Sequence, residues 1–304
     1  MGAELRARKE KGVGGIPIRL RKGLNKILLY SLVFIFVIAV VAPFLWMTIS
    51  SISPQVELTT KPPHWFPETP TLIRFAALIF GSDTGKSMPV ATERFVSALL
   101  NSIVVSITTT ILCIAAGVSA AYALARLPVP GERHFLIGML GAQMLPRIVI
   151  IIPLFFQMKA INLIDTRIGL IIIYSGFMLP TVIWIMHSYF QTIPMDLEEA
   201  AMIDGCSRFS ALIRIILPLS GPGIVAVAAF TFLSSWNEFF ISLIMTTSQA
   251  KTITVIITEF ATQFGVDYGL MATGGVIGSI PPILLAFSLQ RYIVKGLTSG
   301  AVKG

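Results

Sequence analysis

Several long segments without a charged side chain constrain what this chain can fold into. They are residues 27–56, 95–125, 168–195, 215–237 and 268–290, together with 135–158, in which Arg147 is the one charged residue. An apolar segment of about 18 residues or more can cross a bilayer as a helix. So many of them could not all be buried inside one soluble domain of 304 residues. Water is therefore not the main solvent of this chain.

The six segments predict an all-α, polytopic membrane protein with six transmembrane helices. Only 12% of the residues are charged, whereas a soluble domain carries about a quarter. Helices are favoured over strands because the segments lack two-residue alternation, and because each span in lipid must satisfy its own backbone groups. We expect one transmembrane domain at 27–293, preceded by a basic arm at 1–26 and followed by a tail at 294–304.

Basic residues are unevenly distributed, and this orients the predicted spans. Eight of the 23 Lys and Arg precede residue 27, in a chain whose formal net charge is +8. With the N-terminus in the cytoplasm, 15 of them lie inside and 7 outside, as the positive-inside rule requires. Six crossings then place both termini in the cytoplasm. The positive charge thus indicates contact with a lipid bilayer, and we expect no nucleic-acid partner.

The loops on the predicted outer side are mostly irregular. Six prolines lie between residues 51 and 94, and proline at this density resists the interior of helices and strands. We therefore expect an irregular cap there, with one short helix near 72–80. A tight turn near 162–166 and a loop at 247–267 belong to the same side.

The loop at 191–218 differs, because it is polar, helix-prone and on the predicted inner side. We expect Asp196 to cap a short helix over 197–204, with Glu199 completing a capping box. Gly205 then permits a sharp turn.

Beyond that turn a second short helix is expected. Ser207 can cap it, and it should continue through Arg214 until Pro218 ends it before the fifth span. The two helices would form a hairpin beneath the membrane.

The first of these helices carries a motif. The sequence reads Glu199-Ala200-Ala201-Met202-Ile203-Asp204-Gly205, and Arg214 and Leu217-Pro218 follow. It resembles the "EAA" loop of binding-protein-dependent ABC importer permeases, in which E-A-A, two variable residues and D-G-A precede L-P. Cys206 and Leu212 depart from that pattern, where the family usually has alanine and phenylalanine. Both replacements are apolar, so they leave the implied docking role intact.

Four further segments resemble the maltose-type, MalG-like carbohydrate branch of that family. They are Pro62-Pro63, Leu163-Ile164-Asp165-Thr166, Trp236-Asn237-Glu238-Phe239 and the run Gly296-Leu297-Thr298-Ser299-Gly300-Ala301-Val302-Lys303-Gly304. The resemblance covers close to the full length. It implies a permease subunit of an ATP-driven ABC importer in a bacterial inner membrane. With a second permease, it would form the path for a di- or oligosaccharide or a related polyol or glycerol phosphate.

The resemblance also implies partners and the residues that meet them. Two ATPase subunits would bind ATP and Mg, an extracytoplasmic binding protein would deliver the sugar, and this chain would bind no cofactor. The residues implied in coupling to an ATPase are Glu199, Ala200, Ala201, Asp204, Gly205, Arg214 and Pro218, with a further contact from Lys303 and Gly304. This subunit would be a transport protein without an ATPase site, and not an enzyme.

Polar residues within the spans are candidates for the translocation path. They are Arg147, Trp236, Asn237 and Glu238. A charge that faces lipid at mid-membrane costs at least about 2.5 kcal/mol, so Arg147 must face protein or water. Pro146 and Pro153 flank it, and span three is expected to be broken or kinked there. Arg147 could donate hydrogen bonds to a passing solute or form an ion pair with Glu238 or the companion permease, and the sequence leaves both open.

Two other classes of membrane protein would show different sequence patterns. A secondary transporter driven by an ion gradient would show inverted repeats and paired intramembrane carboxylates. A membrane enzyme would show convergent reactive side chains at one depth. The sequence shows neither pattern. Cys113 falls in the second span and Cys206 in the inner loop, so we predict no disulfide, no metal site and no catalytic residue.

Overall fold

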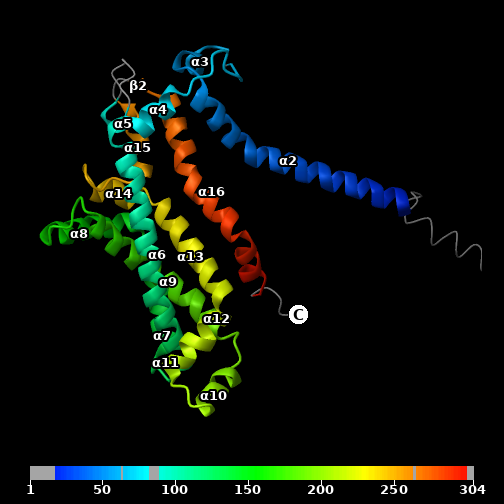
Figure 1. The fold of residues 1–304 in the computed structure, drawn as a ribbon, viewed down its shortest axis with the longest axis vertical. Coiled ribbons are helices and arrows are strands. Elements are labelled where there is room, and N and C mark those ends of the chain that lie inside the picture. The colour runs from blue at the N-terminus through cyan, green and yellow to red at the C-terminus, as the bar shows by residue number, and fades with distance from the viewer. Residues whose placement is uncertain (1–17, 63, 82–88, 263–264, 300–304) are drawn as a thin grey trace, which may run out of the picture.

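Residues 18–62, 64–81, 89–262 and 265–299 are described by the computed structural model. Over these ranges the chain is mainly helical (Figure 1), which confirms the all-α prediction. The exception is an antiparallel pair of two-residue strands, β1 (Ala261–Thr262) and β2 (Gly265–Val266). Most of the predicted basic arm and the end of the predicted tail lie outside the described residues.

Four helices of the described chain are long and apolar enough to cross a membrane. They are α2 (Ile18–Ile52), α6 (Phe95–Arg126), α9 (Arg167–Phe190) and α16 (Tyr268–Ser299). Two further spans are bent pairs of helices, so six crossings result when each pair counts as one. This agrees with the predicted number of spans. Because α16 runs to Ser299, the predicted tail at 294–304 begins within this helix.

Span three is broken, as Pro146 suggested. α7 (Glu132–Gln143) and α8 (Arg147–Ala160) meet at 93°. Pro146 is the N-cap of α8, and a proline disfavours helical backbone in the residue before it. The break therefore comes at Pro146, whereas Pro153 is contained within α8.

Span five is a second bent pair. Its first part consists of α11 (Arg208–Ala211), the π-helical turn η1 (Leu212–Ile216) and α12 (Leu217–Leu219), and its second part is α13 (Gly221–Trp236). The two parts meet at 77° around Ser220. The hairpin expected beneath the membrane therefore continues directly into the span.

Pro218 does not end the hairpin helix, so this prediction was wrong. The helix runs on to Leu219 because the turn before the proline is widened, with the Leu217 N–H bonded to the Leu212 carbonyl. A proline has no N–H, and its ring crowds the carbonyl four residues earlier in an α-helix. The wider π turn accommodates the ring without stopping the helix.

The spans pack as a bundle in which α6 lies against α9 and α13, and α13 lies against α16 (Figure 1). Membrane helices approach closely where their side chains are small. A Cβ at Gly117 of α6 would lie 2.6 Å from Val182 Cγ1 of α9, and one at Gly223 of α13 would lie 2.7 Å from the Tyr189 ring. These glycines therefore set the distance between the helices.

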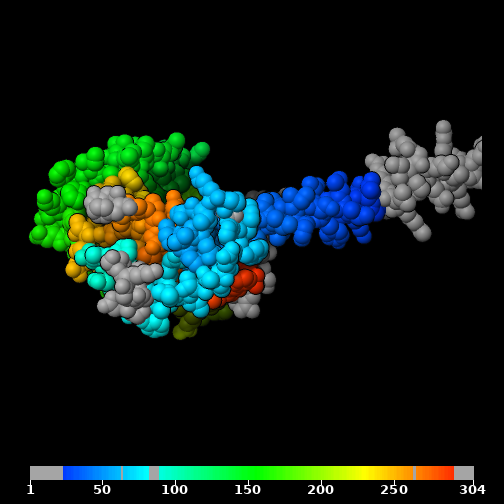
Figure 2. All heavy atoms as spheres, turned by 90° about the horizontal axis from the view of Figure 1, so that it is seen from above, coloured from blue at the N-terminus to red at the C-terminus, as the bar shows by residue number. Residues whose placement is uncertain are grey.

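α2 extends away from this bundle (Figures 1 and 2). It meets α16 near its C-terminal end, where Met47 Sδ would lie 2.8 Å from a Cβ at Gly275. Its large apolar side chains between residues 24 and 45 are exposed. An apolar surface of this size needs lipid or another chain to cover it.

Shorter elements occupy the two ends of the bundle. At one end lie α3 (Gln55–Thr59), α4 (Ile73–Phe80), α5 (Val90–Glu93) and α15 (Ile253–Thr258), with α14 (Phe240–Met245) nearby, and at the other lie α10 (Asp196–Ile203) and α11 (Figure 1). α4 confirms the short helix predicted near 72–80. The proline-rich cap and the hairpin were predicted on opposite sides of the membrane, and they lie at opposite ends of the bundle.

The close contact between α6 and α9 makes a prediction. Gly117→Ala should destabilise the protein by about 1–3 kcal/mol, because the added methyl group overpacks a buried contact with Val182. Gly176→Ala on α9 is the matched control, since a Cβ there meets nothing within 4 Å. Thermal unfolding of both purified variants in detergent measures the difference, and equal midpoints would contradict the role of Gly117.

Candidate functional site

Two helices at one end of the bundle form the hairpin expected between spans four and five. α10 and α11 are joined at Gly205, whose φ of +90° is a left-handed conformation that glycine adopts without strain. The Ser207 hydroxyl accepts a hydrogen bond from the Ser210 N–H at 3.2 Å and so caps α11. The turn predicted at Gly205 and the cap predicted at Ser207 are therefore confirmed.

The capping box predicted at the start of α10 is wrong. α10 begins at Asp196, one residue earlier than expected, and its N-cap is Met195, which makes no side-chain capping bond. Asp196, Glu198 and Glu199 all lie in the first turn. The helix dipole favours negative charge there, so the carboxylates stabilise the start of the helix without a capping box.

Glu198, which the motif did not single out, anchors the hairpin to the bundle. It is 4% exposed, and its carboxylate accepts a hydrogen bond from the Tyr122 hydroxyl. Arg126 Nε lies 3.6 Å from Glu198 Oε2. This approach is an ion pair without a hydrogen bond, whereas Arg126 Nη2 donates to the carbonyls of Phe190 at 2.9 Å and Ile193 at 2.7 Å. This anchor cluster of Tyr122, Arg126 and Glu198 joins α6, the end of α9 and α10.

The sequence contains a signal for the anchor cluster. Tyr122 and Arg126 are four residues apart near the end of a span, so they share one face of α6. Glu198 and Ala201 are three residues apart on α10, and both are buried. The signal was missed because an arginine at the end of a span also fits the positive-inside rule.

The outer surface of the hairpin is exposed. Most residues implied in ATPase coupling are exposed, namely Glu199, Ala200, Asp204 and Gly205 in the hairpin, Arg214 in η1 and Pro218 in α12, whereas Ala201 is buried within the chain. Two large apolar side chains accompany them, Ile203 at 86% and Phe209 at 70% exposure. Exposed apolar side chains beside charged ones indicate a surface for a protein partner. Lys303 and Gly304 lie outside the described residues.

A second candidate site lies at the break in span three. Arg147 is the first residue of α8, and its Nη1 lies 2.6 Å from Oε2 of Glu238, which follows α13. Glu238 is buried, and its Oε1 accepts a hydrogen bond from the Ile241 N–H at 3.1 Å. Of the alternatives that the sequence left open, the structure thus shows the ion pair with Glu238. The Arg147 side chain stays 53% exposed, with its guanidinium 5.6 Å from the Phe177 ring centroid.

Trp236 and Asn237 lie at the end of α13 but do not join this pair. Trp236 is buried, and its indole N–H donates to the Gly278 carbonyl of α16 at 3.1 Å. Asn237 is exposed, and its amide donates to the Leu233 carbonyl at 2.8 Å. Trp236 therefore holds α13 against α16, and a place of either residue in a translocation path stays a prediction.

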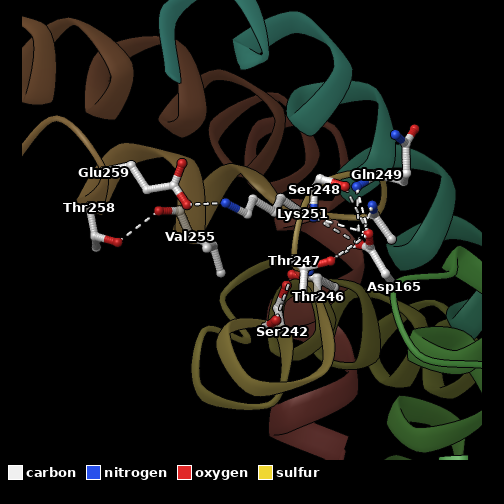
Figure 3. A network of polar contacts seen from close by, with 11 residues as sticks. Asp165, Ser242, Thr246, Thr247, Ser248, Gln249, Lys251, Val255, Thr258 and Glu259 are labelled. Carbon is white, nitrogen blue, oxygen red and sulfur yellow. Dashed lines mark hydrogen bonds and ion pairs between the residues drawn. The ribbon is translucent and has the colours of Figure 1, made fainter. Parts of the chain in front are cut away.

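At the other end of the bundle, Asp165 holds the turn between α8 and α9 against the loop after α14 (Figure 3). Its carboxylate accepts hydrogen bonds from the N–H groups of the four residues 247–250 at 3.0–3.2 Å. The hydroxyls of Thr247 and Ser248 add bonds of 2.8 and 3.0 Å. The sequence showed a turn here, but not that its aspartate binds a distant loop.

Asn101 fixes the same loop from another helix. It lies in α6, and its amide donates to the carbonyls of Gln249 at 2.8 Å and Lys251 at 2.9 Å. Its carbonyl oxygen accepts a bond from Arg167 Nε at 2.6 Å. The loop at 246–251 is therefore fixed to α6 as well as to the turn before α9.

The two cysteines of the chain lie in different parts of the fold. Cys113 is buried in α6 and Cys206 lies in the hairpin, and both are free thiols. Within the described ranges, no group of three or more His, Cys, Asp and Glu could hold a metal ion. The polar clusters described above are thus built from ion pairs and hydrogen bonds.

The anchor cluster makes a second prediction. Glu198→Ala should release the hairpin and destabilise the protein by about 3–5 kcal/mol, because it leaves the buried Arg126 unpaired. Glu199→Ala is the matched control, since this neighbouring side chain is exposed and its loss should change stability by less than about 0.5 kcal/mol. Amide hydrogen exchange at 195–211 measures the release. Equal protection in the two variants would contradict the anchoring role.

The loop bound by Asp165 makes a third prediction, on pH. Burial opposes ionisation of Asp165, but the hydrogen bonds from Gln249, Ala250 and Thr247 outweigh it and hold its pKa below the ordinary value of 3.8. A carboxyl with a lowered pKa stabilises the fold above its unfolded-state pKa, and this contribution is lost as the pH falls through the folded-state pKa. Amide exchange at 246–251 should therefore stay slow down to a pH below 3.8.

Asp165→Asn is the comparison for that experiment. The amide cannot accept hydrogen bonds from all four N–H groups as strongly as the carboxylate does. Amide exchange at 246–251 should therefore be faster in this variant than in the wild-type protein already at neutral pH. Wild-type protein that loses its protection well above the ordinary pKa of aspartate would contradict the assignment.

Residues 114–299 match the family described as binding-protein-dependent transport system inner membrane component. The trehalose transport system permease protein SugB of Mycobacterium tuberculosis is 38% identical, over 86% of this chain and 92% of its own length. The trehalose/maltose transport system permease protein MalG of Thermococcus litoralis is 34% identical, over 92% of this chain and 98% of its own length. The sulfoquinovosyl glycerol transport system permease protein SmoH of Agrobacterium fabrum is 34% identical, over 86% and 88%.

Solved structures share the fold. A chain of a bacterial ABC transporter involved in the import of the acidic polysaccharide alginate has a TM-score of 0.73 at 20% identity, covering 90% of this chain and 97% of that chain. A chain of the MetNI methionine ABC transporter has a TM-score of 0.52 at 16% identity, covering 66% and 95%. The family match spans more than half of the chain, and the relatives match over most of it. The chain therefore belongs to the family of binding-protein-dependent transport system inner membrane components, the permease subunits of ABC importers.

Proposed function

We propose that this permease imports a sugar, together with a second permease subunit, two ATPase subunits and an extracytoplasmic binding protein. The single observation that carries the coupling to an ATPase is the hairpin, because it combines exposed side chains with a buried anchor to the spans. Its exposed surface would dock on one ATPase. ATP and Mg would bind to the ATPase subunits, and this chain would contribute movement of its spans.

The connections of the hairpin fit the role of a lever. Glu198 ties it to α6 through Tyr122 and Arg126, and Arg126 ties it to the end of α9. On its other side the hairpin helix runs on to Leu219 and turns into α13. A displacement of the hairpin would therefore reach three spans through buried contacts. Lys303 and Gly304 are proposed as a further ATPase contact.

The orientation proposed for the chain follows from this role. The hairpin would face the cytoplasm, where the ATPase subunits are, and both termini would lie on the same side. The excess of Lys and Arg on that side supports this orientation. The opposite end, with α4, α15 and the loop at 246–251, would then face the binding protein.

The proposed second permease has a surface to cover. The apolar side chains of α2 are exposed along most of the helix, which leaves the bundle (Figure 2). A neighbouring permease and lipid together would bury them. The path for the solute would lie between the two permeases, with Arg147, Trp236, Asn237 and Glu238 proposed along it.

A sugar is proposed as the solute because of what the relatives transport. Their names specify trehalose, trehalose or maltose, diacetylchitobiose and sulfoquinovosyl glycerol. The common feature of these solutes is a glycosidic, hydroxyl-rich structure. A disaccharide or a small glycoside is therefore the proposed class.

Charge reversal on the hairpin tests this function. Glu199→Lys and Asp204→Lys should abolish ATP-dependent uptake and the co-purification of the ATPase, because both side chains are exposed on the proposed docking surface. Membrane insertion should be unchanged. Glu68→Lys is the control for ATPase co-purification, since this exposed glutamate lies at the other end of the bundle. Normal uptake and co-purification in the two hairpin variants would refute the docking assignment.

A further inference from the structure

A small cavity lined by polar and apolar side chains opens at the break in span three. Its polar lining comes from Gln143 of α7, Arg147 of α8, Thr181 of α9 and Ser234 of α13, and its aromatic lining from Phe177 and Phe230. The cavity volume is about 120 Å³, which is room for several water-sized groups. Four helices from distant parts of the chain thus supply polar side chains to one place.

The polar groups of the cavity are held in place. The Gln143 amide donates to the Thr181 hydroxyl at 2.9 Å and to the Phe177 carbonyl at 3.4 Å. Arg147 is fixed by Glu238 at 2.6 Å, and its guanidinium lies over the Phe177 ring. A site whose polar groups are oriented before a ligand arrives loses less entropy on binding.

The charge of the cavity is compensated. Glu238 is buried beside Arg147, and its second oxygen is bonded to the Ile241 N–H, so the carboxylate faces protein. The Arg147 side chain is half exposed. The cavity therefore presents N–H donors whose positive charge is already balanced. An anion entering it would lose hydration without meeting an unpaired cation, whereas a hydroxyl group could accept a hydrogen bond.

We propose that this cavity is a contact site for a neutral saccharide. The ligand's hydroxyl groups would bind to Arg147 and Gln143, and its C–H surface would pack on Phe230. Aromatic walls with a few convergent polar groups are typical of small-molecule sites. The inference rests on the proposed function, since it names the class of sugar and the side chains that touch it.

Cysteine labelling in the assembled transporter tests the contact. In a chain with Cys113 and Cys206 replaced by serine, Ser234→Cys places one thiol in the cavity. During ATP turnover with the binding protein, the neutral disaccharide that stimulates ATPase activity should slow the labelling of this thiol several-fold. Ser279→Cys is the matched control, because this half-buried serine of α16 does not line the cavity. Its labelling rate should not change with sugar.

The outcomes separate this inference from the proposed function. If the sugar stimulates ATPase activity but leaves the labelling at position 234 unchanged, the contact site is wrong and the sugar importer stands. If no sugar stimulates ATPase activity in the unmodified complex, the proposed function fails and the contact site fails with it. Protection by an anionic sugar as strong as that by a neutral one would overturn the class of ligand.

The compensated charge has its own test. In the same Ser234→Cys chain, an anionic and a cationic thiol reagent should label the thiol at similar rates, once the rate of each reagent is divided by its rate with Ser279→Cys. Adding Glu238→Gln removes the charge that balances Arg147. The labelling rate with the anionic reagent should therefore rise several-fold relative to the rate with the cationic reagent. Combining Glu238→Gln with Arg147→Gln should restore the original ratio. If Glu238→Gln leaves the ratio of anionic to cationic labelling rates unchanged, Glu238 does not balance the charge of Arg147.

Discussion

The backbone groups and charged side chains in the membrane part of this chain need partners within the protein, because the hydrocarbon core supplies no water. Backbone groups meet this requirement in helices. Charged side chains meet it in pairs, as Arg147 does with Glu238 and Arg126 with Glu198. The break in span three at Pro146 lies beside the Arg147 pair.

α6 and α9 connect the two ends of the molecule. At one end, Asn101 of α6 and Asp165 before α9 hold the loop at 246–251. At the other end, Arg126 of α6 bonds to the Phe190 carbonyl and faces Glu198 of the hairpin. Between these clusters the two helices pack closely. The hairpin and the loop at the opposite end are therefore bound to the same two packed helices.

Local features of the sequence predicted the elements well. Apolar length predicted six spans, and the conformational freedom of Gly205 and the hydroxyl of Ser207 predicted the turn and cap of the hairpin. The prediction at Pro218 failed because a π turn, stabilised within the packed bundle, can absorb a proline that would stop an isolated α-helix. The role of Glu198 was also missed because it depends on packing. Glu198 is buried against α6, whereas the adjacent Glu199 is exposed, and the sequence alone does not distinguish the two.

The sequence by itself determined the membrane environment, the number of spans, the hairpin and its motif, because apolar length and turn residues act over short distances along the chain. Only the tertiary structure decided which polar side chains meet. Arg147 and Glu238 are 91 residues apart, and Tyr122 and Glu198 are 76 residues apart. Such pairs depend on how distant helices pack against one another, and this packing is not encoded in a local pattern.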